Sequence, residues 1–127
     1  MMLTENEISK IILDIAFDIH INLGPGLFES VYEEVLFYEL TNYGLKIKRQ
    51  KAIPVFWQEL IMDVGFKADL IVENKVIIEI KSIEALAPIH YKQLTTYLKI
   101  TNLKLGLLIN FNEYLLKDGI KRIANKL

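Results

Sequence analysis

The segment Val76–Ser82, VIIEIKS, constrains the fold of this chain more than any other, because two charged residues interrupt its apolar run. Its β-branched residues predict a strand, and their density predicts that the strand is buried. Burying a charge is costly unless the charge is paired, hydrogen-bonded or bound to a metal. Glu79 and Lys81 must therefore find partners in the fold.

Length and composition restrict the class of protein. The 127 residues have the length of one domain, so we expect a single domain over residues 1–127. With a net charge of -1, the protein as a whole does not attract polyanions such as nucleic acid. Any site for a polyanion must therefore be a local cluster of basic residues. The chain has no cysteine, which excludes thiolate catalysis and disulfides, and its 2 histidines argue against a multi-histidine zinc site. A metal would be held mainly by oxygen ligands.

The N-terminus gives no targeting signal. MMLTENEISK lacks the basic-then-apolar layout of a signal peptide. No uncharged apolar run approaches the ~18 residues of a membrane span. We expect a cytoplasmic protein with no membrane partner.

Periodicity predicts the order of helices and strands. Thr4–Glu7 has the sequence of a capping box, and the helix that it opens should end at Gly24–Gly26, GPG. A second helix is predicted at about 27–43, with Gly44 as its stop. We expect one α/β domain with strands at 45–50, 53–57, 60–66, 68–72, 76–81 and 105–110, a helix at 88–100 and a short C-terminal helix at about 113–124.

Two carboxylates lie on the arms of the hairpin that turns at residues 73–75. Directly paired residues of a hairpin share a face, so Asp69 and Glu79 share one only if the loop has an odd number of residues. We predict a three-residue loop, with Asn74 or Lys75 in the left-handed conformation. A two-residue Asn74-Lys75 turn would place the carboxylates on opposite faces.

Adjacent carboxylates repel each other unless positive charge lies between them. Lys81 should share the face of Glu79. A hard divalent cation such as Mg²⁺, bound by carboxylates and a backbone carbonyl, would complete the neutralisation. The alternative is a plain Glu79–Lys81 ion pair on a solvated strand edge.

The motifs of the chain together resemble those of the PD-(D/E)XK nuclease superfamily. Asp69 followed by Glu79-Ile80-Lys81 is similar to its Asp, spacer and (D/E)xK strand, although Ala68 replaces the proline. Residues 26–32, GLFESVY, match the GxxExxY motif that names a small bacterial and archaeal family within it. Other similar segments are 93–97, 107–111 and 119–122. The resemblance implies a restriction-endonuclease-like core, a mixed central β-sheet flanked by helices.

The resemblance also implies a function and a site. It implies a Mg²⁺-dependent nuclease, with Mn²⁺ as a substitute, that hydrolyses phosphodiesters in DNA or RNA. Asp69, Glu79 and the Ile80 carbonyl would bind the metal, and Lys81 would position the attacking water. Glu29 would be a further acid, binding a second metal or orienting a hydrated one. In the alternative, Glu29 is a first-turn glutamate favoured by the helix dipole.

Three residues of the helix at 88–100 are candidate accessory residues. Gln93 and Tyr97 project from one helical face, and in some nuclease branches of the superfamily a QxxxY of this kind lies beside the site. His90 lies on roughly the same face. The alternatives are ordinary core packing for Tyr97 and a structural role for His90.

One stretch is densely basic, and it comprises Lys46, Lys48, Arg49 and Lys51. These side chains could contact phosphates or form a solvated strand edge that discourages edge-to-edge pairing. Since fold does not fix function, an inactive nuclease-fold module that binds nucleic acid or protein, or oligomerises, remains an alternative. So does a partner-binding subunit with a structural acidic cluster. A catalytic domain this small would need a partner to grip a duplex, and a homodimer is one candidate.

Overall fold

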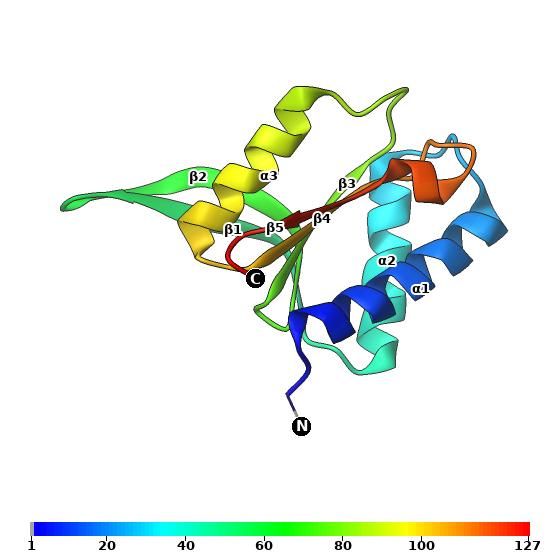
Figure 1. Ribbon diagram of the computed structural model, residues 1–127, viewed down its shortest axis with the longest axis horizontal. Coiled ribbons are helices and arrows are strands. Elements are labelled where there is room, and N and C mark those ends of the chain that lie inside the picture. The colour runs from blue at the N-terminus through cyan, green and yellow to red at the C-terminus, as the bar shows by residue number, and fades with distance from the viewer. Residues whose placement is uncertain (1) are drawn as a thin grey trace.

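Five strands form one sheet with helices on both faces in the computed structural model, which describes residues 2–127 except the side chain of Val64 (Figure 1). The elements are α1 (Glu5–Leu23), α2 (Glu29–Tyr43), β1 (Ile47–Trp57), β2 (Leu60–Val72), β3 (Val76–Lys81), α3 (Pro88–Thr101), β4 (Leu105–Asn110), the 3₁₀ turn η1 (Leu116–Gly119) and β5 (Ile120–Ala124). The strand order is β1-β2-β3-β4-β5. Only β3 and β4 run parallel, so the predicted mixed α/β sheet is confirmed.

Helices α1 and α2 begin and end largely at the predicted signals. The capping box is present, since Thr4 Oγ1 accepts from the Glu7 amide at 3.2 Å and Glu7 Oε1 accepts from the Thr4 amide at 2.9 Å. Helix α2 ends at Gly44, whose left-handed φ of 107° suits glycine. It begins at Glu29, two residues later than predicted, because Phe28 is still extended. Within residues 2–127, no helix is long and apolar enough to cross a membrane.

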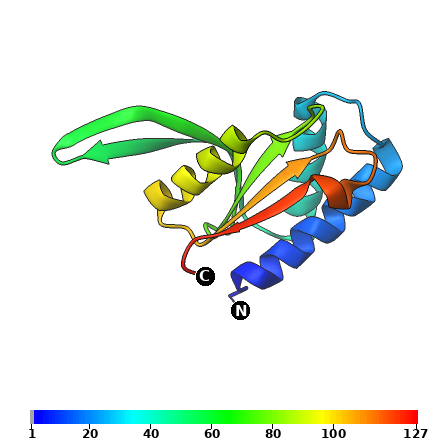
Figure 2. The same ribbon diagram turned by 45° about the horizontal axis from the view of Figure 1, so that its top comes forward.

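Strands β1 and β2 are longer than predicted. The segments predicted as separate strands join into two continuous ones, around a turn at Gln58-Glu59 as expected. A register shift between Ile53 and Val55 keeps the two strands paired despite Pro54. The outer part of this hairpin extends away from the body of the molecule (Figures 1 and 2).

The centre of the sheet is formed by β3 and β4. Three residues, Glu73–Lys75, separate β2 from β3, so the odd loop is confirmed. Its left-handed residues are Glu73 and Asn74, which confirms the prediction for Asn74 and not for Lys75. Every residue of β4 is buried, as predicted for a strand covered on both faces. One core lies against α1 and α2, and a second lies against α3.

The predicted C-terminal helix at 113–124 is wrong. The chain makes the short turn η1 and then pairs as β5, antiparallel to β4. The outer edge of buried β4 needs a hydrogen-bonding partner, and this pairing outweighs the local helical pattern. Gly119 suits the turn, because an added Cβ would lie 2.4 Å from the Asn110 carbonyl oxygen.

Candidate functional site

Strands β2 and β3 separate where the two candidate carboxylates lie. Their pairing ends at Leu70 and Ile78, although β3 continues to Lys81. Beyond this pair, Asp69 Oδ2 accepts a hydrogen bond from the Ile80 amide at 2.8 Å. The Asp69 carboxylate thus takes the place of a strand partner for the Ile80 amide. This hydrogen bond points the Asp69 side chain toward the end of β3. We call this opening between the strands the fork.

Glu79 lies one position beyond the last strand pair, beside Asp69. It is 8% exposed, and its Oε1 is buried with no hydrogen-bond partner among the described residues. Burial, followed by the nearby charge of Asp69, raises the pKa of Glu79 to about 9, while Lys81 acts in the opposite direction. Without a cation, Glu79 is therefore protonated at neutral pH.

The backbone of β3 adds a third oxygen to the fork. The N–H and C=O of one residue in an extended strand project to the same side. Because the Ile80 N–H reaches Asp69, the Ile80 carbonyl also projects toward the fork. The Lys81 carbonyl projects the other way and accepts from the Phe111 amide at 2.9 Å. The side chain of Ile80 is buried in the core beneath α1 and α2.

Lys81 and Tyr97 border the carboxylates. Lys81 is half-buried, and its charge is close enough to lower the pKa of Glu79. Tyr97 stacks on Phe66 with 3.7 Å between ring centroids. Burial, followed by the charges of Glu79 and Asp69, raises the pKa of Tyr97. Tyr97 therefore both packs in the core and lies near the fork.

A family model described as the PD-(D/E)XK nuclease superfamily matches residues 6–123. The chain belongs to this superfamily. Neither the curated proteins nor the solved structures yielded a match. Membership agrees with the observed α/β fold and with Asp69 and Glu79 lying on the neighbouring strands β2 and β3, just past their last pair.

Glu29 lies apart from Asp69 and Glu79. It is exposed at the start of α2, where its Oε2 accepts a long hydrogen bond of 3.4 Å from the Ser82 amide. Together with Ser82 and Asn112 it lines an open pocket of about 560 Å³. Within residues 2–127, no three or more acidic, histidine or cysteine residues gather closely enough to hold a metal ion.

The tyrosine of the GxxExxY motif has a structural role. Tyr32 is fully buried and stacks on Phe111 at 4.6 Å between ring centroids. Its hydroxyl donates to the Gly24 carbonyl at 2.6 Å and accepts from the Leu27 amide at 3.1 Å. Tyr32 thereby fixes the loop that precedes Glu29.

Two of the remaining candidates have structural partners. His90 Nδ1 accepts from the Ala87 amide at 2.9 Å, so His90 caps the start of α3, which agrees with the structural alternative. Gln93, one turn later on α3, is exposed. Arg49 Nε donates to Glu33 Oε2 at 2.8 Å, and its guanidinium also pairs with Glu34.

The three lysines of the basic stretch are exposed. Lys48 and Lys51 line a pocket of about 240 Å³ beside Asn74. Lys46 lies at the start of the stretch, next to β1. These lysines are available to phosphates, whereas Arg49 is held against α2.

Sequence reasoning missed a polar link between α2 and the fork. Gln50 Nε2 donates to Glu33 Oε1 at 2.7 Å and to Asp69 Oδ1 at 3.2 Å. Glu33 is 8% exposed, so this buried carboxylate is satisfied by Gln50 and Arg49. Only the position of Gln50 opposite Asp69 in the strand pattern could have indicated the contact.

A second missed residue holds the chain after β3. Asn110 is fully buried, its Oδ1 accepts from the Ile83 amide at 3.1 Å, and its Nδ2 donates to the Ile83 carbonyl at 2.9 Å. A polar residue ending the apolar strand β4 was the available signal. Asn110 fixes the segment that directly follows Lys81.

The donors at the fork fit a hard divalent cation. They are two carboxylates and one directed carbonyl, all oxygen, and one carboxylate oxygen is buried without a partner. Mg²⁺ is usually held by one or two carboxylates, with water and substrate phosphate completing its shell. A third protein carboxylate is therefore not required.

Proposed function

We propose that this chain is a Mg²⁺-dependent nuclease of the GxxExxY family that hydrolyses phosphodiesters in DNA or RNA. The observation that carries the proposal is the buried, unpartnered Oε1 of Glu79 beside Asp69. When Glu79 is ionised, it is a buried carboxylate without a partner, which is costly. A cation at the fork would give that carboxylate a partner, and superfamily membership supports a phosphodiester substrate.

The chain would hold the metal from the fork. Asp69, Glu79 and the Ile80 carbonyl are the proposed ligands, and Mn²⁺ would bind the same oxygen donors. A cation bound there supplies a more acidic water and charge stabilisation of the phosphate. The Ile80 amide and Gln50 each donate to Asp69, so its carboxylate is oriented before any ligand arrives.

Lys81 is the proposed partner of the scissile phosphate and of the attacking water. It follows Glu79 by two residues and so shares its face of β3. Its ammonium can donate to a phosphate oxygen and hold a water beside the carboxylates. Tyr97, on α3, would form one wall of the site. Glu29, which accepts a hydrogen bond from the Ser82 amide, would act as a further acid.

A cleavage assay tests the proposal. Single-stranded, duplex and branched DNA and RNA are incubated with the protein in Mg²⁺ or Mn²⁺. Lys81→Met removes the charge while keeping a long side chain. Lys104→Met is the matched control, because exposed Lys104 precedes Leu105, at the opposite end of the β3–β4 pair from Lys81.

We expect wild type and Lys104→Met to cut at least one substrate. Lys81→Met should lose about 100-fold or more in rate, as expected when charge stabilisation of a transition state is removed. If folded wild type binds Mg²⁺ but cuts none of these substrates, the non-catalytic binding module replaces the nuclease. Equal cutting by Lys81→Met would remove Lys81 from the mechanism.

A further inference from the structure

The β1–β2 hairpin forms an arm whose tip is apolar and exposed. The arm projects from one end of the molecule (Figures 1 and 2). Phe56 and Trp57 are 62% and 67% exposed. The exposed large apolar side chains of the tip, residues 54–63, are Phe56, Trp57, Leu60, Ile61 and Met62.

Both faces of the tip are apolar. Phe56 pairs with Ile61, and the next pair is Trp57 with Leu60, so the two pairs lie on opposite faces of the ribbon. With roughly 150–250 Å² for each aromatic side chain, the tip exposes on the order of 500 Å² of apolar surface. A patch of this size commonly marks an interaction site.

The charge of the tip opposes nucleic acid as the partner. Between residues 52 and 66 the only charged side chains are Glu59 and Asp63, both acidic. A polyanion would be repelled by them. Pro54 and the register shift beside it also discourage strand pairing along the β1 edge. The tip is therefore suited to a protein surface that is apolar and basic.

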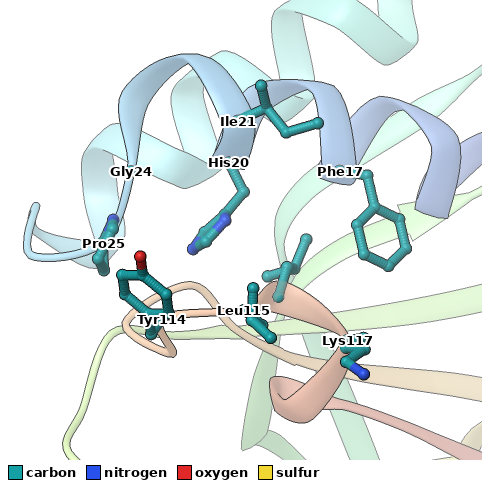
Figure 3. Close-up of a pocket in the computed structure, with 9 residues that line it drawn as sticks. Phe17, His20, Ile21, Gly24, Pro25, Tyr114, Leu115 and Lys117 are labelled. Carbon is teal, nitrogen blue, oxygen red and sulfur yellow. The ribbon is translucent and has the colours of Figure 1, made fainter.

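An apolar pocket with one lysine in its lining lies at the other end of the same chain. This pocket, of about 480 Å³, opens between the end of α1 and the loop leading into η1 (Figure 3). Its apolar lining includes Phe17, Ile21, Pro25, Tyr114 and Leu115. Lys117 is the one formally charged residue among those described as lining it.

His20 fixes one wall of this pocket. It is 8% exposed, and its Nε2 lies 2.8 Å from the Glu113 carbonyl oxygen, which ties α1 to the loop before η1. Figure 3 shows its ring between Pro25 and Tyr114 on one side and Leu115 on the other. The pocket wall is therefore held in place before a partner arrives.

We propose that the arm tip of one copy docks in this pocket of a second copy. Trp57 would enter the apolar pocket, and Glu59 and Asp63 would face Lys117. The tip and the pocket lie at opposite ends of the molecule, so they cannot meet within one chain (Figure 1). With both faces of the tip covered and an equal area on the receiving copy, one contact buries at most about 1,000 Å², near the lower bound for a specific interface.

Trp57 is the only tryptophan in the chain and reports directly on the contact. Dilution should shift its emission to the red as it becomes solvated, in parallel with a fall in mass by analytical ultracentrifugation. Trp57→Ala at the tip and Ile21→Lys in the pocket should each give monomers. Ile21 is 79% exposed, so its substitution should leave the fold intact, which circular dichroism verifies. Tyr38→Lys on α2, at another exposed aromatic, is the control that should associate like wild type.

Two further experiments separate this contact from other modes of association. Mixing Trp57→Ala with Ile21→Lys should restore association, because one retains the pocket and the other the tip. Lys117→Glu should weaken association about tenfold, and adding Glu59→Lys and Asp63→Lys should restore it. A wild type that stays monomeric at all concentrations, or association that survives Trp57→Ala or Ile21→Lys, would overturn the proposal.

Discussion

At the scale of single residues, the Glu79 carboxyl carries a proton that a cation would have to displace. Its pKa in the metal-free fold is about 9, well above the usual value of about 4.3 for a glutamate. Between these two values the folded state binds more protons than the unfolded state. The stability of the metal-free protein should therefore fall as pH rises through this range.

Glu79→Gln tests this linkage, because glutamine keeps the shape of the protonated carboxyl and does not titrate. In the presence of a chelator, wild type should lose stability between about pH 5 and pH 9, by at most about 1.4 kcal/mol per pH unit from this group. The variant should show a flatter profile in urea unfolding. Parallel profiles for the two proteins would mean that Glu79 does not titrate in this range.

Gln50 is a positioning residue for Asp69. Gln50→Gly removes the amide but keeps the backbone, since glycine readily adopts the φ of 50° found there. We expect Mg²⁺ affinity to fall about 10–100-fold, as for other residues that orient metal ligands. Gln58→Gly is the matched control, because Gln58 has a φ of 54° and lies on the hairpin turn. Equal Mg²⁺ affinities in calorimetry would show that Asp69 is oriented without Gln50.

At the scale of secondary-structure elements, Asn110 joins the end of β4 to the chain that leaves β3. Asn110→Ala would leave the Ile83 and Asn112 amides without the side-chain oxygen that accepts from both, and would remove one of the two side-chain donors to the Ile83 carbonyl. At about 1–3 kcal/mol for each such group, we expect a loss of about 2 kcal/mol or more in the free energy of unfolding. Asn112→Ala removes one hydrogen bond, to the Ile83 carbonyl, and should cost less than half as much. Similar urea midpoints for both variants would contradict this role.

Elements with local signals were predicted well from the sequence. The capping box at Thr4, the glycine stop at Gly44 and the three-residue hairpin loop depend on a few neighbouring residues. Strand β5 depends instead on the free edge of β4, which no local period reveals. The link from Glu33 through Gln50 to Asp69 likewise requires α2 to lie beside β1.

The same distinction applies to the candidate site. Asp69, Glu79 and Lys81 could be placed together because strand parity and loop length determine which face each side chain occupies. The capping role of His90 depends on an amide three residues away, and the pairing of Arg49 depends on how α2 packs beside β1. Those contacts decide which charges remain available, and parity does not predict them.

At the scale of the whole molecule, the fork lies in the sheet, whereas the arm and the apolar pocket lie at opposite ends (Figure 1). Metal binding and self-association should therefore be separable by substitution. An arm variant should keep the Mg²⁺ affinity of wild type, and a fork variant should keep its mass.

Calorimetric titration of Mg²⁺ into wild type and Glu79→Gln tests the cation site most directly. Glu84→Gln, at an exposed glutamate shortly after β3, controls for the loss of one charge. Because binding must displace the Glu79 proton, the heat at neutral pH should depend on the ionisation enthalpy of the buffer. We expect wild type and Glu84→Gln to bind one Mg²⁺ with proton release, and Glu79→Gln to bind none. Unchanged binding in Glu79→Gln, or no binding in wild type, would contradict a cation site at the fork.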